Sequence, residues 1–189
     1  MPAVPLSREV SIRPLGIEDA PALVELLLRN RRFLEPFEPT RADAHFTVPG
    51  QRRAIAAAAE EARADKGYAF GIFLDDRLLI GRVSLSNVFR RAWQNANLGY
   101  FLDHAHTGRG YMTAAVQLAL AFAFASARLH RVQAATLEDN AASIRVLEKA
   151  GFRLEGTALR YLHIGGRWRD HRIFAITVEE WSDRQSPPC

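Results

Sequence analysis

The sequence predicts a mixed α/β fold built as one domain. Hairpin patterns occupy residues 68–89 and 153–177, and a strand, helix, strand unit lies between them over residues 97–137. Hairpins pair antiparallel strands, whereas a crossover helix joins strands that run parallel. Together these segments predict a mixed sheet with helices on its faces.

Chain length and composition are those of a globular domain. The 189 residues are 48% hydrophobic, which suffices for a substantial core, and no repeat or low-complexity linker divides them. We therefore expect a single domain over residues 1–189, with a core over residues 9–181 and short tails.

The sequence predicts no targeting signal, no membrane span and no functional cysteine. The longest apolar stretch, residues 114–127, is interrupted by Gln117 and Ser126, and the first ten residues lack a basic-then-apolar signal pattern. We expect a cytoplasmic protein without a membrane span. The single cysteine, Cys189, ends the motif SPPC, so no internal disulfide, cysteine metal cluster or cysteine nucleophile is expected. The net charge of +4 comes from dispersed arginines, which disfavours direct nucleic-acid binding.

The first half of the chain has the pattern of a strand, two helices and a hairpin. Residues 9–15 (EVSIRPL) alternate as a strand does, and residues 17–30 combine early acidic residues with apolar residues at helical spacing. A second helix is expected over residues 50–67, followed by a hairpin over 68–89 around the turn DDR. The connection FLEPFEPTR (residues 33–41) has two prolines and exposed-looking aromatics, so it is expected to form the rim of a binding site.

The second half contains the crossover unit and a closing hairpin. NANLGYFLD (residues 95–103) is expected to be a strand, the apolar run over 111–127 a helix, and RVQAATL (residues 131–137) the parallel strand. A short helix over residues 140–152 ends at a glycine, and residues 153–177 fold back around a Gly-Gly turn.

The turn Gly108-Arg109-Gly110 directly precedes the crossover helix. Backbone N–H groups at a helix start lack internal partners, and the helix dipole adds positive potential there. Glycine at 108 and 110 permits positive φ and close approach of a ligand, and Arg109 adds a charge. We expect a pyrophosphate at this turn. Neither a dinucleotide fingerprint nor a P-loop is present, because the third glycine and the Gly-Lys-Ser/Thr sequence are missing.

A second polar pair follows the parallel strand. Asn140 stands where it can cap the next helix, with Ser143 one turn on. Capping and ligand binding both remain open for Asn140, which can also hold an amide-rich ligand arm while the Ser143 hydroxyl faces the same cleft.

Taken together, these stretches resemble the GNAT superfamily of N-acetyltransferases. The family's pyrophosphate motif, Q/R-x-x-G-x-G/A, is matched by TGRGYM at Gly110 but not at Thr107 or Met112. The stretches GYMT, DNAASIRVLEKAGF, NLGYFLD and GGRWRDHRIFAI are similar to the RimJ/RimL-type acetyltransferases, which modify the N-terminal alanine of ribosomal proteins. The resemblance spans about residues 10–181.

The resemblance implies the GNAT fold and acetyl-CoA as cofactor. The family's sheet is mixed and largely antiparallel, and its parallel strands splay apart to admit the cofactor; here these are NLGYFLD and RVQAATL, with a β-bulge expected at Gly99. The implied cofactor-binding residues are Tyr100, Phe101, Leu102, Thr107, Gly108, Arg109, Gly110, Tyr111, Met112, Thr113, Asn140 and Ser143.

Acetyl transfer needs a neutral amine and a proton for the departing thiolate. The resemblance gives the proton-donor role to Ser143, with Tyr100 as a rival. Glu155 is slightly preferred as general base, Glu138 is the second candidate, and a water relay without a dedicated base stays open. An α-amine, with a pKa of roughly 7.7–8.0, is partly neutral at physiological pH, so an enzyme acting on chain ends manages with a modest base.

The remaining candidate residues are assigned to the acceptor groove or to no site. Trp168, Asp170 and His171 can shape the groove or merely stabilise the hairpin, and Phe33, Phe37 and Arg41 form the other expected wall. The histidines lack metal-ligand spacing, so no metal is expected.

The function expected from these features is acetyl transfer to the N-terminal α-amine of a ribosomal protein, alanine first. Two alternatives remain: an acetyltransferase of a small amine such as an antibiotic, toxin or polyamine, and a catalytically idle CoA-binding module. A monomer and a homodimer are both compatible with the sequence.

Overall fold

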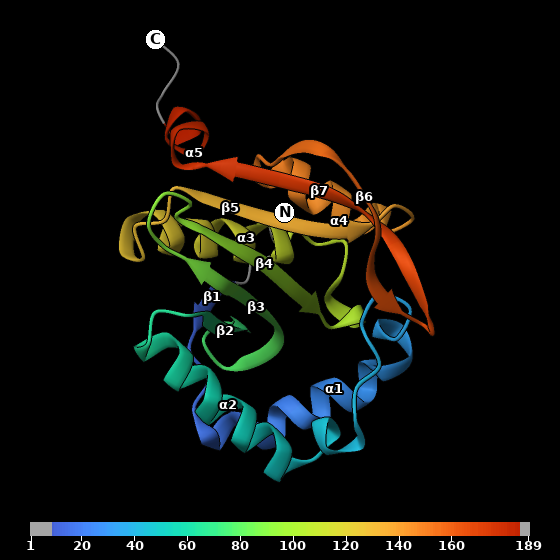
Figure 1. Cartoon of the computed structure of the whole chain (residues 1–189). Coiled ribbons are helices and arrows are strands. Elements are labelled where there is room, and N and C mark those ends of the chain that lie inside the picture. Colours follow the sequence, from blue (N-terminus) through green and yellow to red (C-terminus); the bar gives the residue numbers. More distant parts are fainter. Residues whose placement is uncertain (1–8, 186–189) are drawn as a thin grey trace, which may run out of the picture.

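A seven-stranded sheet forms the centre of the computed structural model, which describes residues 9–185 (Figure 1). The strand order is β1-β2-β3-β4-β5-β7-β6, and the β4–β5 pair alone is parallel. The predicted signal-free N-terminus and Cys189 lie outside the described residues, apart from Glu9 and Val10. The strands are β1 (Val10–Arg13), β2 (Tyr68–Leu74), β3 (Leu78–Phe89), β4 (Asn95–Leu102), β5 (Arg131–Leu137), β6 (Arg153–Ile164) and β7 (Arg167–Thr177).

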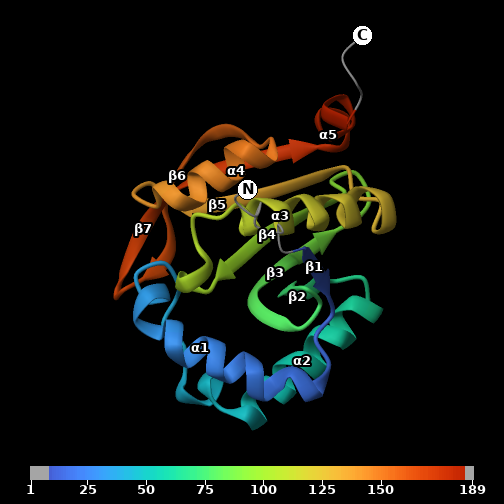
Figure 2. The same cartoon turned by 180° about the vertical axis from the view of Figure 1, so that it is seen from behind.

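The helices cover both faces of the sheet. They are α1 (Ala20–Leu34), α2 (Val48–Arg63), α3 (Tyr111–Ala121), α4 (Ala141–Ala150) and α5 (Val178–Gln185). Figures 1 and 2 show α1 and α2 on one face and α3 and α4 on the other. Over residues 9–185, no helix combines the length and apolar character needed to cross a bilayer.

The helix ends follow local chemistry. The side chain of Thr47 accepts a hydrogen bond from the N–H of Gly50 and so caps α2, and Gly151, with φ +102°, ends α4. At the end of α3 the helix widens into a π-helical turn over Phe122–Ser126. Apart from α5, every strand and α-helix was expected from the sequence.

Successive side chains of β4 pack alternately into two different hydrophobic clusters. Tyr100 packs against the cluster that includes Met112 of α3 and Leu147 of α4. Phe101 packs against the cluster under α1 and α2, which includes Leu23. Because successive strand side chains point to opposite faces, β4 separates two compartments.

The parallel strands β4 and β5 separate halfway along. Their pairing runs from Asn95 opposite Arg131 to Leu98 opposite Ala134 and stops there. Beyond this point each strand keeps its outer partner, β3 for β4 and β7 for β5. The expected splayed pair is confirmed, and it leaves unpaired backbone edges facing a gap.

The expected β-bulge at Gly99 is wrong. The register between β3 and β4 continues evenly through Ser84 opposite Gly99, and its shift lies between Ser86 and Phe89. A Cβ added to Gly99 would meet only the Ser84 hydroxyl, at 3.6 Å. The glycine therefore keeps the α1/α2 side of the gap free of a side chain, rather than bending the strand.

Candidate active site

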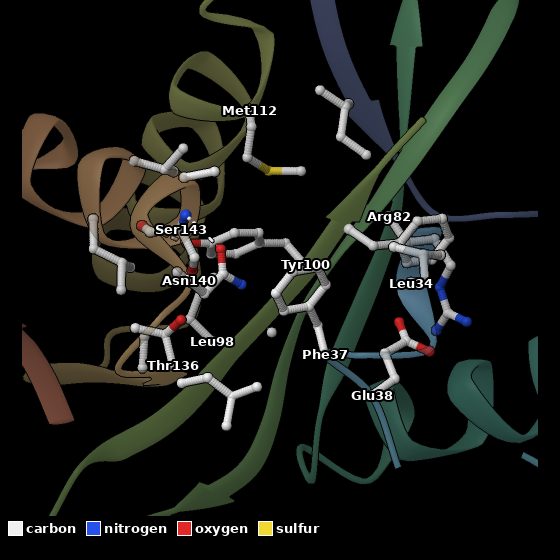
Figure 3. Close-up of a pocket in the computed structure, with 18 of the residues that line it drawn as sticks. Leu34, Phe37, Glu38, Arg82, Leu98, Tyr100, Met112, Thr136, Asn140 and Ser143 are labelled. Carbon is white, nitrogen blue, oxygen red and sulfur yellow. Dashed lines mark hydrogen bonds between the residues drawn. The ribbon is translucent and has the colours of Figure 1, made fainter. Parts of the chain in front are cut away.

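A cavity of about 590 Å³ lies where β4 and β5 part, and it is lined from both faces of the sheet. Figure 3 shows Asn140 and Ser143 on one side of Tyr100, and Glu38 with Arg82 on the other. The α3/α4 side and the α1/α2 side thus meet in one space. Two different molecules can reach the gap from opposite faces.

The α3/α4 side begins at the glycine turn. Gly108 has φ +75° and Gly110 has φ +81°, and a Cβ added to either would meet no atom within 4 Å. Positive φ, and not crowding within the protein, therefore accounts for these glycines. Both line the cavity, while the exposed Arg109 does not.

The first turn of α3 offers free donors to this space. Its first helical hydrogen bond runs from the N–H of Ala114 to the Gly110 carbonyl oxygen, at 3.0 Å. The N–H groups of Tyr111, Met112 and Thr113 precede it, so they have no acceptor within the helix. These residues line the cavity together with Thr107, whose hydroxyl donates to the carbonyl of His104 at 2.8 Å. Such donors suit a pyrophosphate.

Two hydroxyl groups and one amide meet in the middle of the cavity. Oη of Tyr100 lies 2.8 Å from Oγ of Ser143, and either atom can be the donor. Asn140 Oδ1 accepts the N–H of Ser143 at 3.1 Å, so the expected helix cap is confirmed. Capping occupies the oxygen of Asn140 and leaves its amide nitrogen for a ligand.

Burial determines the protonation of Tyr100. Loss of solvent raises the pKa of its hydroxyl to about 12, although the hydrogen bond with Ser143 acts in the opposite direction. The phenol keeps its proton across the physiological range and can serve as a hydrogen-bond donor. Phe101 and Leu102, the next residues of β4, also line the cavity.

Neither carboxylate expected to be the base reaches the cavity. Glu155 lies on β6 and accepts a 2.8 Å hydrogen bond from Arg131, at the start of β5, while Arg153 is its second cationic partner. Across β7, the backbone of Glu155 lies level with Ala134 and Ala135 of β5, but its side chain is paired with Arg131 and does not line the cavity. The Arg131 hydrogen bond lowers its pKa to about 2, with a further contribution from Arg153. Glu138 is exposed after β5 and does not line the cavity.

The α1/α2 side contains charged groups that the sequence analysis did not select. Phe33, Phe37 and Arg41 line it as expected, but so do Glu38, His45 and Arg82. One signal for Arg82 was available: an arginine in the middle of an otherwise apolar strand, LLIGRVSL, on a sheet with both faces covered.

The β6–β7 hairpin contributes one of its three proposed groove residues. His171 is buried, lines the cavity, and places Nδ1 3.0 Å from the carbonyl oxygen of Arg169. Asp170 instead accepts the N–H of Arg160 at 2.7 Å, where the β6–β7 register shifts. Trp168 is 62% exposed and packs against His163. Within residues 9–185, no group of three His, Cys, Asp or Glu side chains is placed to hold a metal ion.

The family assignment agrees with this geometry. Residues 9–153 match the family model described as the acetyltransferase (GNAT) domain, which is most of the chain. The protein belongs to the GNAT family and is an acetyl-CoA-dependent N-acetyltransferase.

Three relatives illustrate the match. The probable N-acetyltransferase YjcK of Bacillus subtilis (strain 168) is 47% identical over 171 residues, 89% of this chain and 94% of the relative. The ribosomal protein uS5-alanine N-acetyltransferase of Escherichia coli (strain K12) is 32% identical over 172 residues, 90% and 89% of the two chains. The structure of Mycobacterium smegmatis RimJ in complex with CoA-disulfide has a TM-score of 0.87 and 35% identity, covering 90% of this chain and 83% of that one.

Proposed function

We propose that this acetyltransferase modifies the N-terminal α-amine of a protein, with an alanine of a ribosomal protein as acceptor. Two relatives whose names include this acceptor support it: the uS5-alanine enzyme of Escherichia coli and the ribosomal-protein-S5-alanine acetyltransferase of Vibrio fischeri, both at 32% identity. The name of YjcK, at 47% identity, includes no acceptor. The support for alanine therefore comes from the more distant relatives.

The observation that carries the proposal is the open acceptor side of the cavity. It is lined by Phe37 and Arg41 from the α1–α2 connection and by Leu162, Ile164 and His171 from the β6–β7 hairpin. Figures 1 and 2 both show the tip of this hairpin beside the end of α1. An extended chain end can enter between two such walls, which supports a peptide acceptor.

For the cofactor, we propose that the pyrophosphate binds the N–H groups from Arg109 to Thr113. The pantetheine arm then runs along the unpaired edge of β4 past Tyr100, as an added strand would. In this proposal Asn140 Nδ2 donates a hydrogen bond to this arm. The bound thioester would arrive in the gap between β4 and β5, next to the hydroxyl of Ser143.

The hydroxyl pair supplies the proton for the leaving group. Attack of the amine nitrogen on the thioester carbon forms the C–N bond, and collapse of the intermediate breaks the C–S bond. The departing thiolate then accepts a proton relayed through Ser143 and Tyr100. Which hydroxyl donates directly is tested below.

Acetylation of defined acceptors tests the substrate. Purified protein and acetyl-CoA are incubated with an Ala-leading peptide containing an internal lysine, with the same peptide blocked at its α-amine, and with spermidine. We expect thiol release with the first substrate and a single acetyl group on its α-nitrogen by tandem mass spectrometry. The matched blocked peptide controls for lysine acetylation.

The cellular acceptor is tested by intact mass spectrometry of ribosomal proteins from a deletion strain and its complemented control. Loss of the mass of one acetyl group from one ribosomal protein in the deletion strain supports the proposal. Unchanged acetylation of every ribosomal protein, or turnover confined to spermidine, contradicts it and favours a small-amine enzyme.

A further inference from the structure

Among the described residues, Glu38 supplies the one carboxylate that lines the acceptor side of the cavity. This residue lies in the connection after α1, and its side chain is 26% exposed. Figure 3 shows its carboxylate beside Arg82, across Tyr100 from Ser143 and Asn140. Phe37, its chain neighbour, lies next to Tyr100 in the same view. The carboxylate therefore faces the space into which an acceptor amine must enter.

Two guanidinium groups act on this carboxylate. Nε of Arg41, from the same connection, lies 3.8 Å from Oε2 of Glu38. Arg82 comes from β3, where it pairs with Phe101 and so points to the α1/α2 side. Burial raises the pKa of Glu38, and both arginines act against this rise. The arginines favour the ionised carboxylate, and burial makes it a better proton acceptor than an exposed glutamate.

The nearby histidine is excluded as a proton acceptor by its hydrogen bond. Nε2 of Gln51 lies 3.3 Å from Nδ1 of His45 and can only donate. Burial, followed by Arg41 and Arg82, lowers the pKa of His45, so its imidazole is neutral at pH 7. With Nδ1 accepting, the single ring proton is on Nε2, and no lone pair remains for an amine.

We propose that Glu38 binds the acceptor ammonium group and accepts its proton, acting as the general base of acetyl transfer. The ammonium nitrogen loses one proton to the carboxylate and attacks the thioester carbon. It loses a second proton as the intermediate collapses, and this proton restores the hydroxyl pair, which has given one of its own to the CoA sulfur. The proton on Glu38 then leaves to water, so the products are the amide, CoA thiol and one proton.

This proposal depends on the acetyl transfer that the family performs, not on the identity of the acceptor. Its test therefore uses whichever primary amine of the peptide and spermidine panel the wild-type protein acetylates fastest. If only spermidine reacts, the ribosomal substrate is excluded while the role of Glu38 is still measured.

The decisive measurement is the pH dependence of kcat/KM for Glu38→Gln. An enzyme that takes the proton from a bound ammonium works below the pKa of the amine, whereas a variant without the base depends on neutral amine already in solution. For an α-amine with a pKa of about 7.8, the neutral fraction rises roughly tenfold or more between pH 6.5 and pH 8.5. We expect kcat/KM of the variant to rise by that factor, while the wild-type value changes little.

Glu35→Gln is the matched control, because Glu35 is exposed three residues earlier and does not line the cavity. It should keep the wild-type profile. The affinity of Glu38→Gln for CoA, measured by calorimetry, should equal that of the wild type, which separates loss of the base from misfolding.

A second variant tests the electrostatic setting of Glu38. Arg82→Met removes a positive charge beside the carboxylate, so the acidic limb of the wild-type profile should move to higher pH. In the double variant with Glu38→Gln this movement should disappear. If kcat/KM of Glu38→Gln is lower than that of the wild type by the same factor at every pH, the proposal is overturned. The proposal is also overturned if Glu38→Gln retains the acidic limb of the pH profile and His171→Gln loses it, since His171 then supplies the base.

Discussion

Oη of Tyr100 and Oγ of Ser143 lie 2.8 Å apart and so link β4 to α4. Tyr100 Oη also lies 3.3 Å from the carbonyl oxygen of Ser143 and can donate to it. Two hydroxyl protons are thus available, and one of them is sufficient for the bond between the pair. The second can be directed at a ligand, so this pair is the local source of a proton for a leaving thiolate.

The variants Tyr100→Phe and Ser143→Ala should show which hydroxyl donates the proton to the thiolate and which one only positions the donor. The variant that lacks the direct donor should lose kcat on the order of 10²-fold, because positioned acids contribute about that much. The other should lose clearly less, and KM for acetyl-CoA should change little in both. Steady-state kinetics on both single variants and the double variant provide the measurement. Wild-type kcat in both single variants would remove the pair from the mechanism.

The glycine turn before α3 can be tested against a glycine elsewhere that has nearly the same φ. Gly110 (φ +81°) lines the cavity, whereas Gly166 (φ +79°) lies in the β6–β7 turn outside it; a Cβ added to either would meet nothing within 4 Å. Alanine at either position should cost about 1 kcal/mol of stability through backbone strain. Only Gly110→Ala should also weaken CoA binding, and Gly110→Trp should abolish it. Calorimetric Kd values that change equally at 110 and 166 would contradict the pyrophosphate site.

Local patterns were sufficient for the sheet but not for the general base. The strands Tyr68–Leu74 and Arg131–Leu137 were predicted at their observed bounds, because alternation and turn residues act within a few positions. Glu38 was missed although its loop was expected to form a rim. Its placement depends on docking of that loop against Arg82 of β3, which no local pattern encodes.

Long-range ion pairing explains the misassigned carboxylate, and an overlooked cap explains the missed helix. Glu155 was expected to be the base, but β6 lies beyond β7 in the sheet, and Arg131 and Arg153 hold the Glu155 side chain outside the cavity. α5 has a readable signal: Thr177 and Glu180 form a capping box, with the Glu180 carboxylate accepting the Thr177 N–H at 2.8 Å.

Glu155→Gln should affect stability and leave activity unchanged. The pKa of Glu155 is depressed from its usual 4.5 to about 2 by Arg131 and then Arg153, so its ionised form favours the folded state. That contribution is complete above pH 4.5, falls as the pH drops through the window to about 2, and is absent below it. Because the group is 29% exposed, we expect a loss of about 1 kcal/mol at pH 7.

Denaturant titrations of the wild type and of Glu155→Gln at pH 7 and at pH 2.5 measure this difference. The free energies of unfolding of the two proteins should converge at the lower pH. Unchanged kcat at pH 7 is the accompanying expectation. A fall in kcat of Glu155→Gln with unchanged stability would return this residue to the list of candidate bases.

The buried carboxylate of Asp103 should link the stability of α1 to cofactor binding. It directly follows β4, in the segment that leads to the glycine turn, is 1% exposed, and accepts a 2.9 Å hydrogen bond from Nε of Arg29 on α1. It also accepts the N–H of Ala105 at 3.3 Å, which shapes the loop leading to Thr107. Burial raises the pKa of Asp103, but the hydrogen bonds from Arg29 and its neighbours outweigh this and lower it. The carboxylate is therefore charged and depends on Arg29.

Arg29→Met should cost about 2 kcal/mol of stability, because it leaves a buried charge without its main partner. CoA should bind severalfold more weakly, since the loop before the turn loses its anchor. Arg63→Met is the control: Arg63 and Glu60 form an ion pair on α2 whose side chains are 67% and 72% exposed, and solvent screens such pairs. Thermal melts and CoA titrations should leave the Arg63 variant close to wild type. A loss of stability in Arg29→Met with unchanged CoA affinity would mean that the turn holds its geometry without α1.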